Sequence, residues 1–260
     1  MIGRIHGSSI FHEIAGEGLP LIFVHGLGST GNVWHAQRVA LSKYFKVVTL
    51  DLTGSGRSDK SERHYTMEKW CEQIAGLADH LKFDKIVLIG HSMTTVLAQK
   101  FAARHGNRIH ALVLCGPITE LSQVGKEAFT KRAETVTKEG MIAVADQVVT
   151  GALTPATRES NPALAGLVRE MLLANDPPCY AGHCHALISG SSKPDQPHIK
   201  CPTLILVGDQ DSVTPLANAR AIAAAVPSAK IRIVPATAHL TMLERPETFN
   251  AALVEFLAGL

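Results

Sequence analysis

Three side chains in this sequence could together carry out nucleophilic catalysis. They are Ser92, Asp211 and His239, and each follows closely on a short apolar segment. A serine hydroxyl is a weak nucleophile until a histidine accepts its proton, and a carboxylate can hold that histidine in the required tautomer. Each residue alone has an ordinary structural explanation, as a helix cap or a loop residue. Their order along the chain and their shared position after apolar segments favour a catalytic triad.

Two glycine-containing turns could place backbone N–H groups near Ser92. The segment Gly90-His91-Ser92-Met93-Thr94 follows one apolar run, and His25-Gly26-Leu27-Gly28 follows another. We expect the N–H groups of Met93 and Leu27 to form an oxyanion hole, because a tetrahedral intermediate needs donors beside the nucleophile. His25 precedes a glycine-rich turn, so we interpret it as a residue that holds this loop by hydrogen bonding.

The elements that must position these residues alternate along the chain. Amphipathic segments separate short β-branched runs, as at residues 67–81, where apolar residues recur at spacings of three and four after a possible N-cap, Thr66. A second helix is predicted from Pro246 onward. Several runs are apolar on both faces, which predicts an α/β fold with a mostly parallel sheet and helices on both faces. The predicted strands are residues 10–14, 21–24, 46–50, 86–89, 111–114, 204–207 and 231–234.

The alternation stops between residues 119 and 199, where only helical patterns are found. We therefore predict a core of residues 1–118 and 200–260 and a helical cap of residues 119–199. A segment inserted at this place must cross the carboxyl edge of the sheet, where ligands bind in open α/β folds. We expect the cap to set substrate choice through residues such as Tyr180 and His183. Its interspersed charges favour a small to medium substrate over a long-chain lipid, and its cations could attract an anion.

Composition excludes several classes of protein. The chain has 260 residues, 46% of them hydrophobic, and a formal net charge of +2. Nucleic acid and anionic membrane are therefore poor partners, and we expect a small-molecule substrate. We also expect no membrane span and no signal peptide, which favours the cytoplasm. The oligomeric state cannot be predicted from these features.

The cysteines and histidines do not form a convincing metal site. Five cysteines are scattered along the chain without a Cys-x-x-Cys pair. Cys179, His183, Cys184 and His185 lie close together in the sequence, but no further ligand pair accompanies them. We interpret this group as part of a substrate-lining or solvated helix face, and we expect no metal.

One motif suggests a different chemistry. Residues 26–31 match Gly-x-Gly-x-x-Gly after a predicted strand, and Asp51 follows at the spacing of a dinucleotide-binding fingerprint. We expect Asn32 to be a new N-cap and Asp51 to brace the Gly54-Ser55-Gly56 turn. A dinucleotide would leave the three candidate catalytic residues unexplained, so no cofactor is expected.

Along nearly all its length the chain resembles the α/β-hydrolase family. His25-Gly26 is similar to the oxyanion loop of that family, residues 51–58 to its Asp-x-x-Gly-x-Gly-x-Ser turn, and residues 90–93 to its nucleophile elbow. Residues 239–246 resemble its His-x-x-x-x-Glu-x-Pro stretch. Residues 41–45 and 139–141 and the cap length resemble the branch of 3-oxoadipate enol-lactonases and small serine esterases. The resemblance implies the α/β-hydrolase fold with a triad of Ser92, Asp211 and His239.

The sequence departs from the family pattern at three points. Thr94 stands where the second elbow glycine is usual, and Ala238 stands where a glycine usually precedes the catalytic histidine. The cap contains no tryptophan, since the two of the chain are Trp34 and Trp70.

We expect a serine hydrolase that cleaves a carboxylic ester or lactone through an acyl-enzyme, without cofactor or metal. Three alternatives stay open: a C–C bond hydrolase of a diketone, a ligand receptor with slow turnover, which Thr94 suggests, and a dinucleotide-dependent oxidoreductase.

Overall fold

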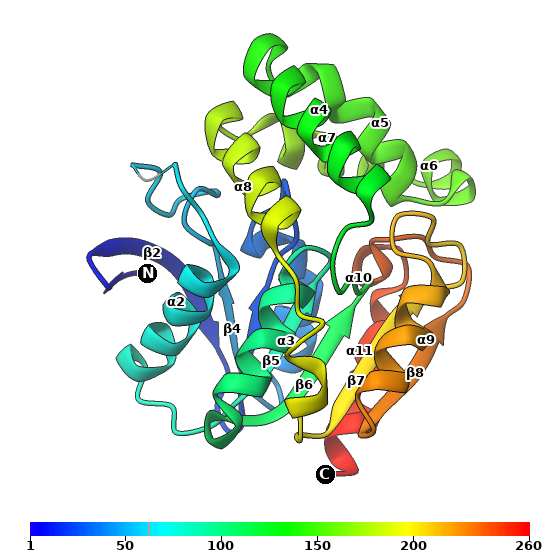
Figure 1. The fold of residues 1–260 in the computed structure, drawn as a ribbon. Helices are drawn as coiled ribbons and strands as arrows, with labels where there is room; N and C mark the ends of the chain where they lie inside the picture. The colour runs from blue at the N-terminus through cyan, green and yellow to red at the C-terminus, as the bar shows by residue number, and fades with distance from the viewer. Residues whose placement is uncertain (62) are drawn as a thin grey trace.

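A single eight-stranded sheet forms the centre of the molecule in this computed structural model, which describes residues 1–61 and 63–260 (Figure 1). The strand order is β1-β2-β4-β3-β5-β6-β7-β8. Strand β2 is antiparallel to both of its neighbours, and the pairs from β4 to β8 are parallel. The mostly parallel sheet predicted from the sequence is therefore confirmed. The strands are β1 (Ile2–Ile5), β2 (Ser8–Ala15), β3 (Pro20–Val24), β4 (Lys46–Leu50), β5 (Ile86–His91), β6 (Ile109–Cys115), β7 (Thr203–Gly208) and β8 (Ala229–Val234).

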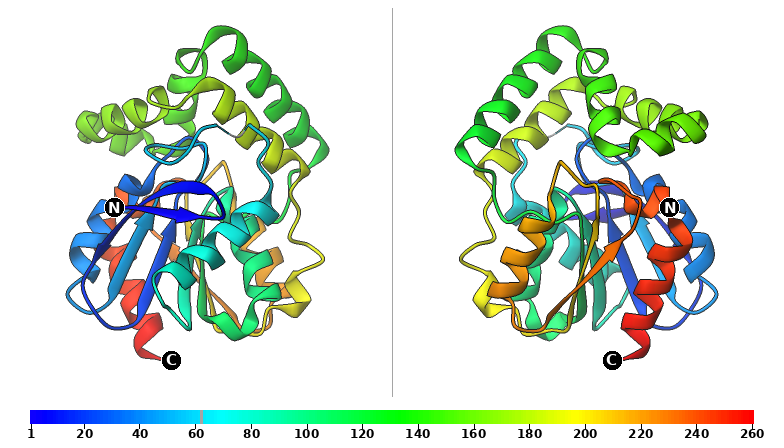
Figure 2. Two further views of the ribbon diagram at one scale, coloured as in Figure 1. Left: turned by 90° about the vertical axis from the view of Figure 1, so that its left-hand side faces the viewer. Right: turned by 90° about the vertical axis from the view of Figure 1, so that its right-hand side faces the viewer.

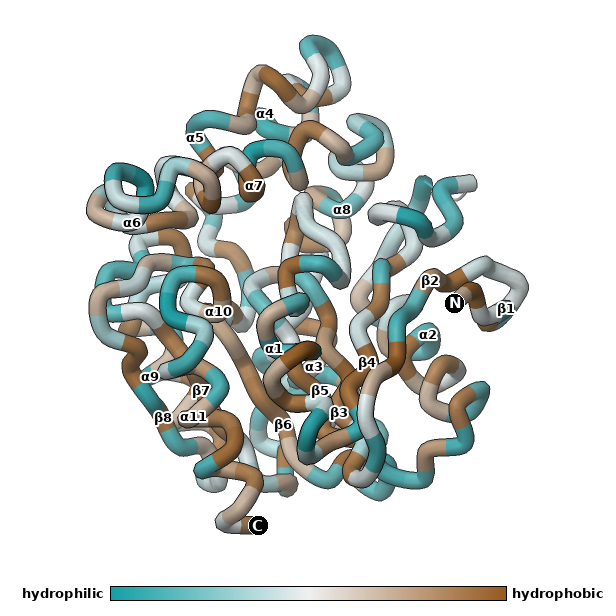
Figure 3. Tube along the Cα trace, turned by 180° about the vertical axis from the view of Figure 1, so that it is seen from behind, coloured by the Kyte–Doolittle hydropathy of each residue, from teal (hydrophilic) through white to brown (hydrophobic). Residues whose placement is uncertain are grey.

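Helices cover both faces of the sheet, which is why its central strands are apolar on both sides. Leu21 and Phe23 of β3 face one buried cluster, while Ile22 and Val24 face the other. Figure 3 shows the hydrophobic stretch along β6 inside the molecule and hydrophilic segments at its periphery. On one face lie α2 (Met67–His80), α3 (Thr94–Arg104) and α9 (Leu216–Ala225), and on the other α1 (His35–Leu41) and α11 (Pro246–Ala258).

Local signals set several helix starts. The Thr66 hydroxyl accepts a hydrogen bond from the Lys69 N–H at 3.1 Å, so Thr66 is the N-cap of α2 as predicted. Asn32 is not an N-cap, and this prediction was wrong. A 3-10 helix spans Gly31–Trp34, and Thr30 caps it by accepting from the Asn32 N–H at 3.3 Å. Thr30 precedes Gly31 and has an extended backbone, so Thr30 and not Asn32 is the N-cap.

Five helices between β6 and β7 form a cap, as the sequence predicted. They are α4 (Gln123–Glu139), α5 (Ile142–Ala152), α6 (Pro155–Ser160), α7 (Pro162–Leu173) and α8 (Pro177–Ser189). Figure 2 shows them as a separate layer beyond one end of the strands. The sequence patterns did not predict α6, a short helix that begins at a Thr-Pro pair. The short edge strand β1 was not predicted either. The domain boundaries at residues 119 and 199 stay a prediction. An isolated bridge between Glu120 and Ser191 brings the entry and exit of the cap together.

His183 attaches the cap to the core. Its Nε2 atom lies 3.0 Å from the Thr53 carbonyl oxygen, and its ring meets the rings of Tyr65 and Trp70 edge to face at 4.6 and 5.0 Å. The side chain is almost fully buried.

Within the described residues, no helix is long and apolar enough to cross a membrane.

Acid should loosen this attachment. Burial lowers the pKa of His183 to about 3, below the value of about 6.5 for an exposed histidine. Between these two pH values the unfolded chain binds the proton more readily, so stability falls as the pH drops from about 6.5 toward 3. His183→Gln should reduce the slope of the unfolding free energy against pH by up to about 1.4 kcal/mol per pH unit. Urea unfolding at several pH values measures this slope.

The control for this experiment is His185→Gln, which changes an exposed histidine of the same helix. An unchanged slope in the His183→Gln variant would show that burial of His183 does not contribute to acid sensitivity.

Candidate active site

Ser92 lies on a strained turn between β5 and α3. Its φ is +54°, a left-handed conformation that a serine adopts only where the surroundings impose it. The Ser92 N–H donates to the Cys115 carbonyl of β6 at 2.9 Å, which fixes the turn to the neighbouring strand. A Cβ on Gly90 would lie 2.8 Å from the Thr94 carbonyl oxygen. This strand–turn–helix geometry is that of a nucleophile elbow.

Thr94 fits the elbow where a glycine is usual in the family. The residue is fully buried, and its hydroxyl oxygen lies 3.0 Å from the His91 N–H, which donates to it. The same hydroxyl has two acceptors for its proton, the Val24 carbonyl at 3.1 Å and the His91 carbonyl at 3.0 Å. The hydroxyl of Thr94 therefore connects the elbow to the end of β3.

Asp211 and His239 meet at the same edge of the sheet. Asp211 follows β7 and His239 follows β8, and His239 Nδ1 lies 2.9 Å from Asp211 Oδ2. The Thr214 hydroxyl donates to Asp211 Oδ2 at 2.8 Å, and the N–H groups of Val213 and Thr214 donate to Oδ1 at 2.9 and 2.8 Å. Asp209 instead accepts from the Thr237 N–H at 3.2 Å and is exposed, so of these two aspartates Asp211 is the partner of His239.

These contacts keep Asp211 ionised. Burial alone raises the pKa of its carboxyl group, but the neighbouring His239 and the hydrogen bonds from Thr214 outweigh it and lower the pKa below its usual value. A charged carboxylate therefore lies beside the imidazole, where it favours the Nδ1–H tautomer.

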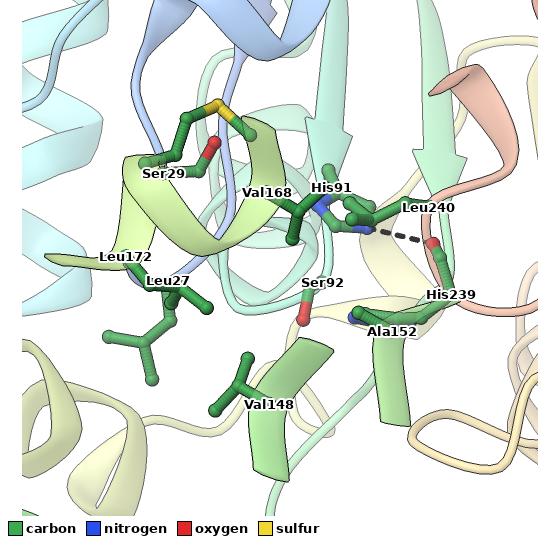
Figure 4. A pocket seen from close by; sticks show the side chains of 12 residues that line it. Leu27, Ser29, His91, Ser92, Val148, Ala152, Val168, Leu172, His239 and Leu240 are labelled. Carbon is green, nitrogen blue, oxygen red and sulfur yellow. Dashed lines mark hydrogen bonds between the residues drawn. The ribbon is translucent and has the colours of Figure 1, made fainter. Parts of the chain in front are cut away.

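Ser92 and His239 line two cavities beneath the cap. A small cavity of about 60 Å³ has mainly apolar walls, and a large cavity of about 440 Å³ also contains polar groups. Figure 4 shows the Ser92 hydroxyl and the His239 ring pointing into the small cavity beside Ala152. Its apolar wall is formed by Leu27, Val148, Ala152, Val168, Met171, Leu172 and Leu240. The large cavity adds Phe129, Arg132, Gln147, Thr150, Gly151, Tyr180, Leu187 and Val213.

The predicted oxyanion donors are N–H groups of two residues near the nucleophile. Leu27 lines the same two cavities as Ser92, and Met93 follows Ser92 directly. Among residues 1–61 and 63–260, neither N–H group donates to another protein group. Gly26 lets the loop after β3 lie close to the turn that carries Ser92, because a Cβ at this position would lie 2.7 Å from His91 Nδ1 and 3.2 Å from the Ser92 Cβ.

His25 and Asp51 support the neighbouring loops. His25 Nδ1 lies 2.8 Å from the Gly26 carbonyl, and its Nε2 accepts from the Leu52 N–H at 3.1 Å. The Asp51 carboxylate accepts from the N–H groups of Gly31 at 2.7 Å and Arg57 at 2.9 Å. Asp51 is fully buried, so its carboxylate is not available to a ribose. The dinucleotide-binding interpretation has no support in this geometry.

The roles of His91 and Glu244 were not predicted from the sequence. His91 Nε2 lies 3.1 Å from the His239 carbonyl, and the two rings are 4.7 Å apart. Burial first, and then the neighbouring His239, lower the pKa of His91 to about 3, so the His91 ring is neutral. Because a carbonyl oxygen can only accept, Nε2 carries the proton and donates it to the His239 carbonyl. Glu244 accepts from the N–H groups of Ala238 at 2.6 Å and Thr154 at 2.9 Å. The Glu of the His-x-x-x-x-Glu-x-Pro stretch could have drawn attention to Glu244. Its contact with Thr154 of the cap could not be predicted from the sequence.

The cap residues singled out from the sequence have different positions. Tyr180 lines the large cavity, as expected of a residue that selects substrate. His183 lines neither cavity, so the expectation that it selects substrate was wrong; its ring is held against Thr53. Cys179 Sγ lies 2.7 Å from Arg63 Nη1. In the part of the chain that the structure describes, no three His, Cys, Asp or Glu residues are arranged to hold a metal.

Comparison with known proteins agrees with this geometry. Residues 20–246 match the family model described as the alpha/beta hydrolase fold. The structure is similar to that of a thermophilic esterase from Thermogutta terrifontis, with a TM-score of 0.95, 31% identity, and 100% of this chain and 98% of that chain covered. For the enol-lactonase from Burkholderia xenovorans the TM-score is 0.94 at 30% identity, with 99% and 100% covered.

A curated relative, 3-oxoadipate enol-lactonase 2 of Acinetobacter baylyi, is 24% identical over 233 residues, which is 90% of this chain and 86% of that protein. Because the family model spans most of the chain, this chain belongs to the α/β-hydrolase family.

Proposed function

We propose that this protein is a serine hydrolase that cleaves a carboxylic ester or lactone through an acyl-enzyme. The observation that carries the proposal is the 2.9 Å contact between His239 and Asp211, with His239 facing the same cavities as Ser92 on its strained turn. The likeness to an esterase and an enol-lactonase at about 30% identity supports an ester or lactone as the substrate class.

The first half of the reaction forms the acyl-enzyme. His239 accepts the Ser92 proton at Nε2 while the serine oxygen attacks the carbonyl carbon. Its Nδ1–H donates to Asp211, whose negative charge stabilises the imidazolium that results. The N–H groups of Leu27 and Met93 bind the oxyanion, and the loss of one such donor typically costs about 3 kcal/mol in the barrier. The imidazolium then protonates the leaving alkoxide as the carbon–oxygen bond breaks.

The second half of the reaction releases the acid. His239 takes a proton from water as the water oxygen attacks the acyl carbon, and the proton then returns to Ser92 as the serine ester bond breaks. For a lactone, the alcohol and the acid leave as one molecule. The cap covers this chemistry and limits the room for the substrate to the two cavities, which supports a small to medium ester rather than a long-chain lipid.

A fluorophosphonate probe tests the nucleophile. The wild-type chain should take up one equivalent of probe on the peptide that contains Ser92, as measured by mass spectrometry. His239→Ala should label far more slowly, because the unaided hydroxyl is a poor nucleophile at neutral pH. Ser8→Ala removes a hydroxyl on β2 and serves as the control. Labelling that persists in Ser92→Ala would contradict the assignment.

The two aspartates after β7 provide a matched pair of variants. Asp211→Asn should lower kcat by about three to four orders of magnitude, because an asparagine favours the wrong histidine tautomer. Asp209→Asn should change kcat by less than about tenfold, because Asp209 binds only the Thr237 N–H. Steady-state kinetics on an activated ester measures both. A larger loss with Asp209→Asn would reverse the assignment.

A further inference from the structure

The cap contacts the loop that carries the predicted oxyanion donor Leu27. Gly28 in this loop is buried, and its φ of +74° lies in the left-handed region that favours glycine. A Cβ at Gly28 would lie 2.7 Å from Leu172 Cδ2 and 2.9 Å from Tyr180 Cε2, both in the cap. The Leu27 side chain packs against the apolar cluster of the cap that contains Tyr180. The cap helices α7 and α8 therefore lie directly on this loop.

Asn175 joins the cap to the same loop by a hydrogen bond. It lies between α7 and α8, and its Nδ2 atom donates to the Gly28 carbonyl oxygen at 3.0 Å. Nδ2 also donates to the carbonyl oxygens of Met171 at 2.8 Å and Leu172 at 3.1 Å, at the end of α7. All three neighbours are carbonyl oxygens, which can only accept, so the nitrogen of the amide must face them. The contacts with α7 close that helix, and the contact with Gly28 ties its end to the loop.

The loop needs such contacts because glycines flank Leu27 on both sides. Glycine adopts left-handed and right-handed conformations about equally readily, so the loop has no strong conformational preference of its own. On the core side, His25 Nδ1 lies 2.8 Å from the Gly26 carbonyl, which belongs to the same peptide group as the Leu27 N–H. On the cap side, Asn175 holds the Gly28 carbonyl. The segment that carries the donor is therefore fixed from both sides.

We propose that Asn175 is a positioning residue for the oxyanion hole, and that its amide holds the loop after β3 so that the Leu27 N–H faces the oxyanion. This inference rests on the proposed function. Asn175 lines neither cavity, so it acts through the loop and does not contact the substrate. A donor held in advance contributes mainly in the transition state, where negative charge develops on the carbonyl oxygen. Loss of the Asn175 amide should therefore lower kcat and leave KM nearly unchanged.

Two asparagines at opposite ends of α7 provide matched variants. Asn175→Leu removes the amide and keeps the approximate size of the side chain, and it should lower kcat for an activated ester about 10- to 100-fold. Asn161→Leu is the control, because Asn161 is the N-cap of α7 and accepts from the Leu164 N–H at 3.1 Å. It should lower the melting temperature but change kcat by less than about threefold. Asn175→Asp is a second variant with the same expected loss of kcat, because it places an oxygen against three carbonyl oxygens.

A pair of ketones separates binding of the oxyanion from binding of the substrate. Benzyl trifluoromethyl ketone forms a tetrahedral adduct with a nucleophilic serine, and the oxygen of this adduct occupies the oxyanion hole. Its inhibition constant should rise about 10- to 100-fold in Asn175→Leu. Benzyl methyl ketone forms no stable adduct and should inhibit the wild-type chain and the variant equally. A merely structural role of Asn175 would weaken both inhibitors alike and would overturn the proposal.

Nuclear magnetic relaxation tests the attachment of the loop without any reaction. The order parameters of the Leu27 and Gly28 amides should fall from about 0.85 to below about 0.6 in Asn175→Leu and stay unchanged in Asn161→Leu. If this fall is found but the wild-type chain hydrolyses no ester, the attachment stands and the proposed function fails. If the wild-type chain hydrolyses esters but Asn175→Leu changes kcat no more than Asn161→Leu does, the proposed function stands and the role of Asn175 is overturned. A loss in Asn175→Leu that falls on KM alone would also overturn it.

Discussion

The buried carboxylate of Asp211 imposes the strictest requirement on this structure. A carboxylate buried away from water must be compensated by hydrogen bonds from its neighbours. Two backbone N–H groups, the Thr214 hydroxyl and His239 supply that compensation. The loops after β7 and β8 can provide it because these strands are parallel neighbours, so their carboxyl ends lie side by side.

The cap and the histidine loop depend on one another. The N–H group of His239 donates at 3.1 Å to the carbonyl oxygen of Ala152, at the end of cap helix α5. Glu244 binds the loop at Ala238 and the cap at Thr154. The position of the imidazole is therefore set partly by the cap that covers it. A change in the cap can alter both the space for the substrate and the orientation of the base, and these two effects need separate measurement.

Much of this architecture could be predicted from the sequence because local signals agree with the global fold. The apolar runs predict the central strands, and the end of alternation near residue 119 predicts the cap. Ser92, Asp211 and His239 were predicted because each lies shortly after the end of a strand. Distances between distant segments could not be predicted. The contact of Glu244 with Thr154 and the position of His183 against Thr53, away from both cavities, depend on how the cap lies on the core.

The most direct test of the account is the detection of a covalent intermediate. Rapid-quench mass spectrometry of the wild-type chain during turnover of an activated ester should find a protein species heavier by the mass of the acyl group, with the acyl group on Ser92. It should form at least as fast as the enzyme turns over. The account would be contradicted if the ester were hydrolysed with no acylated protein at any quench time, or if the acyl group were carried by another residue.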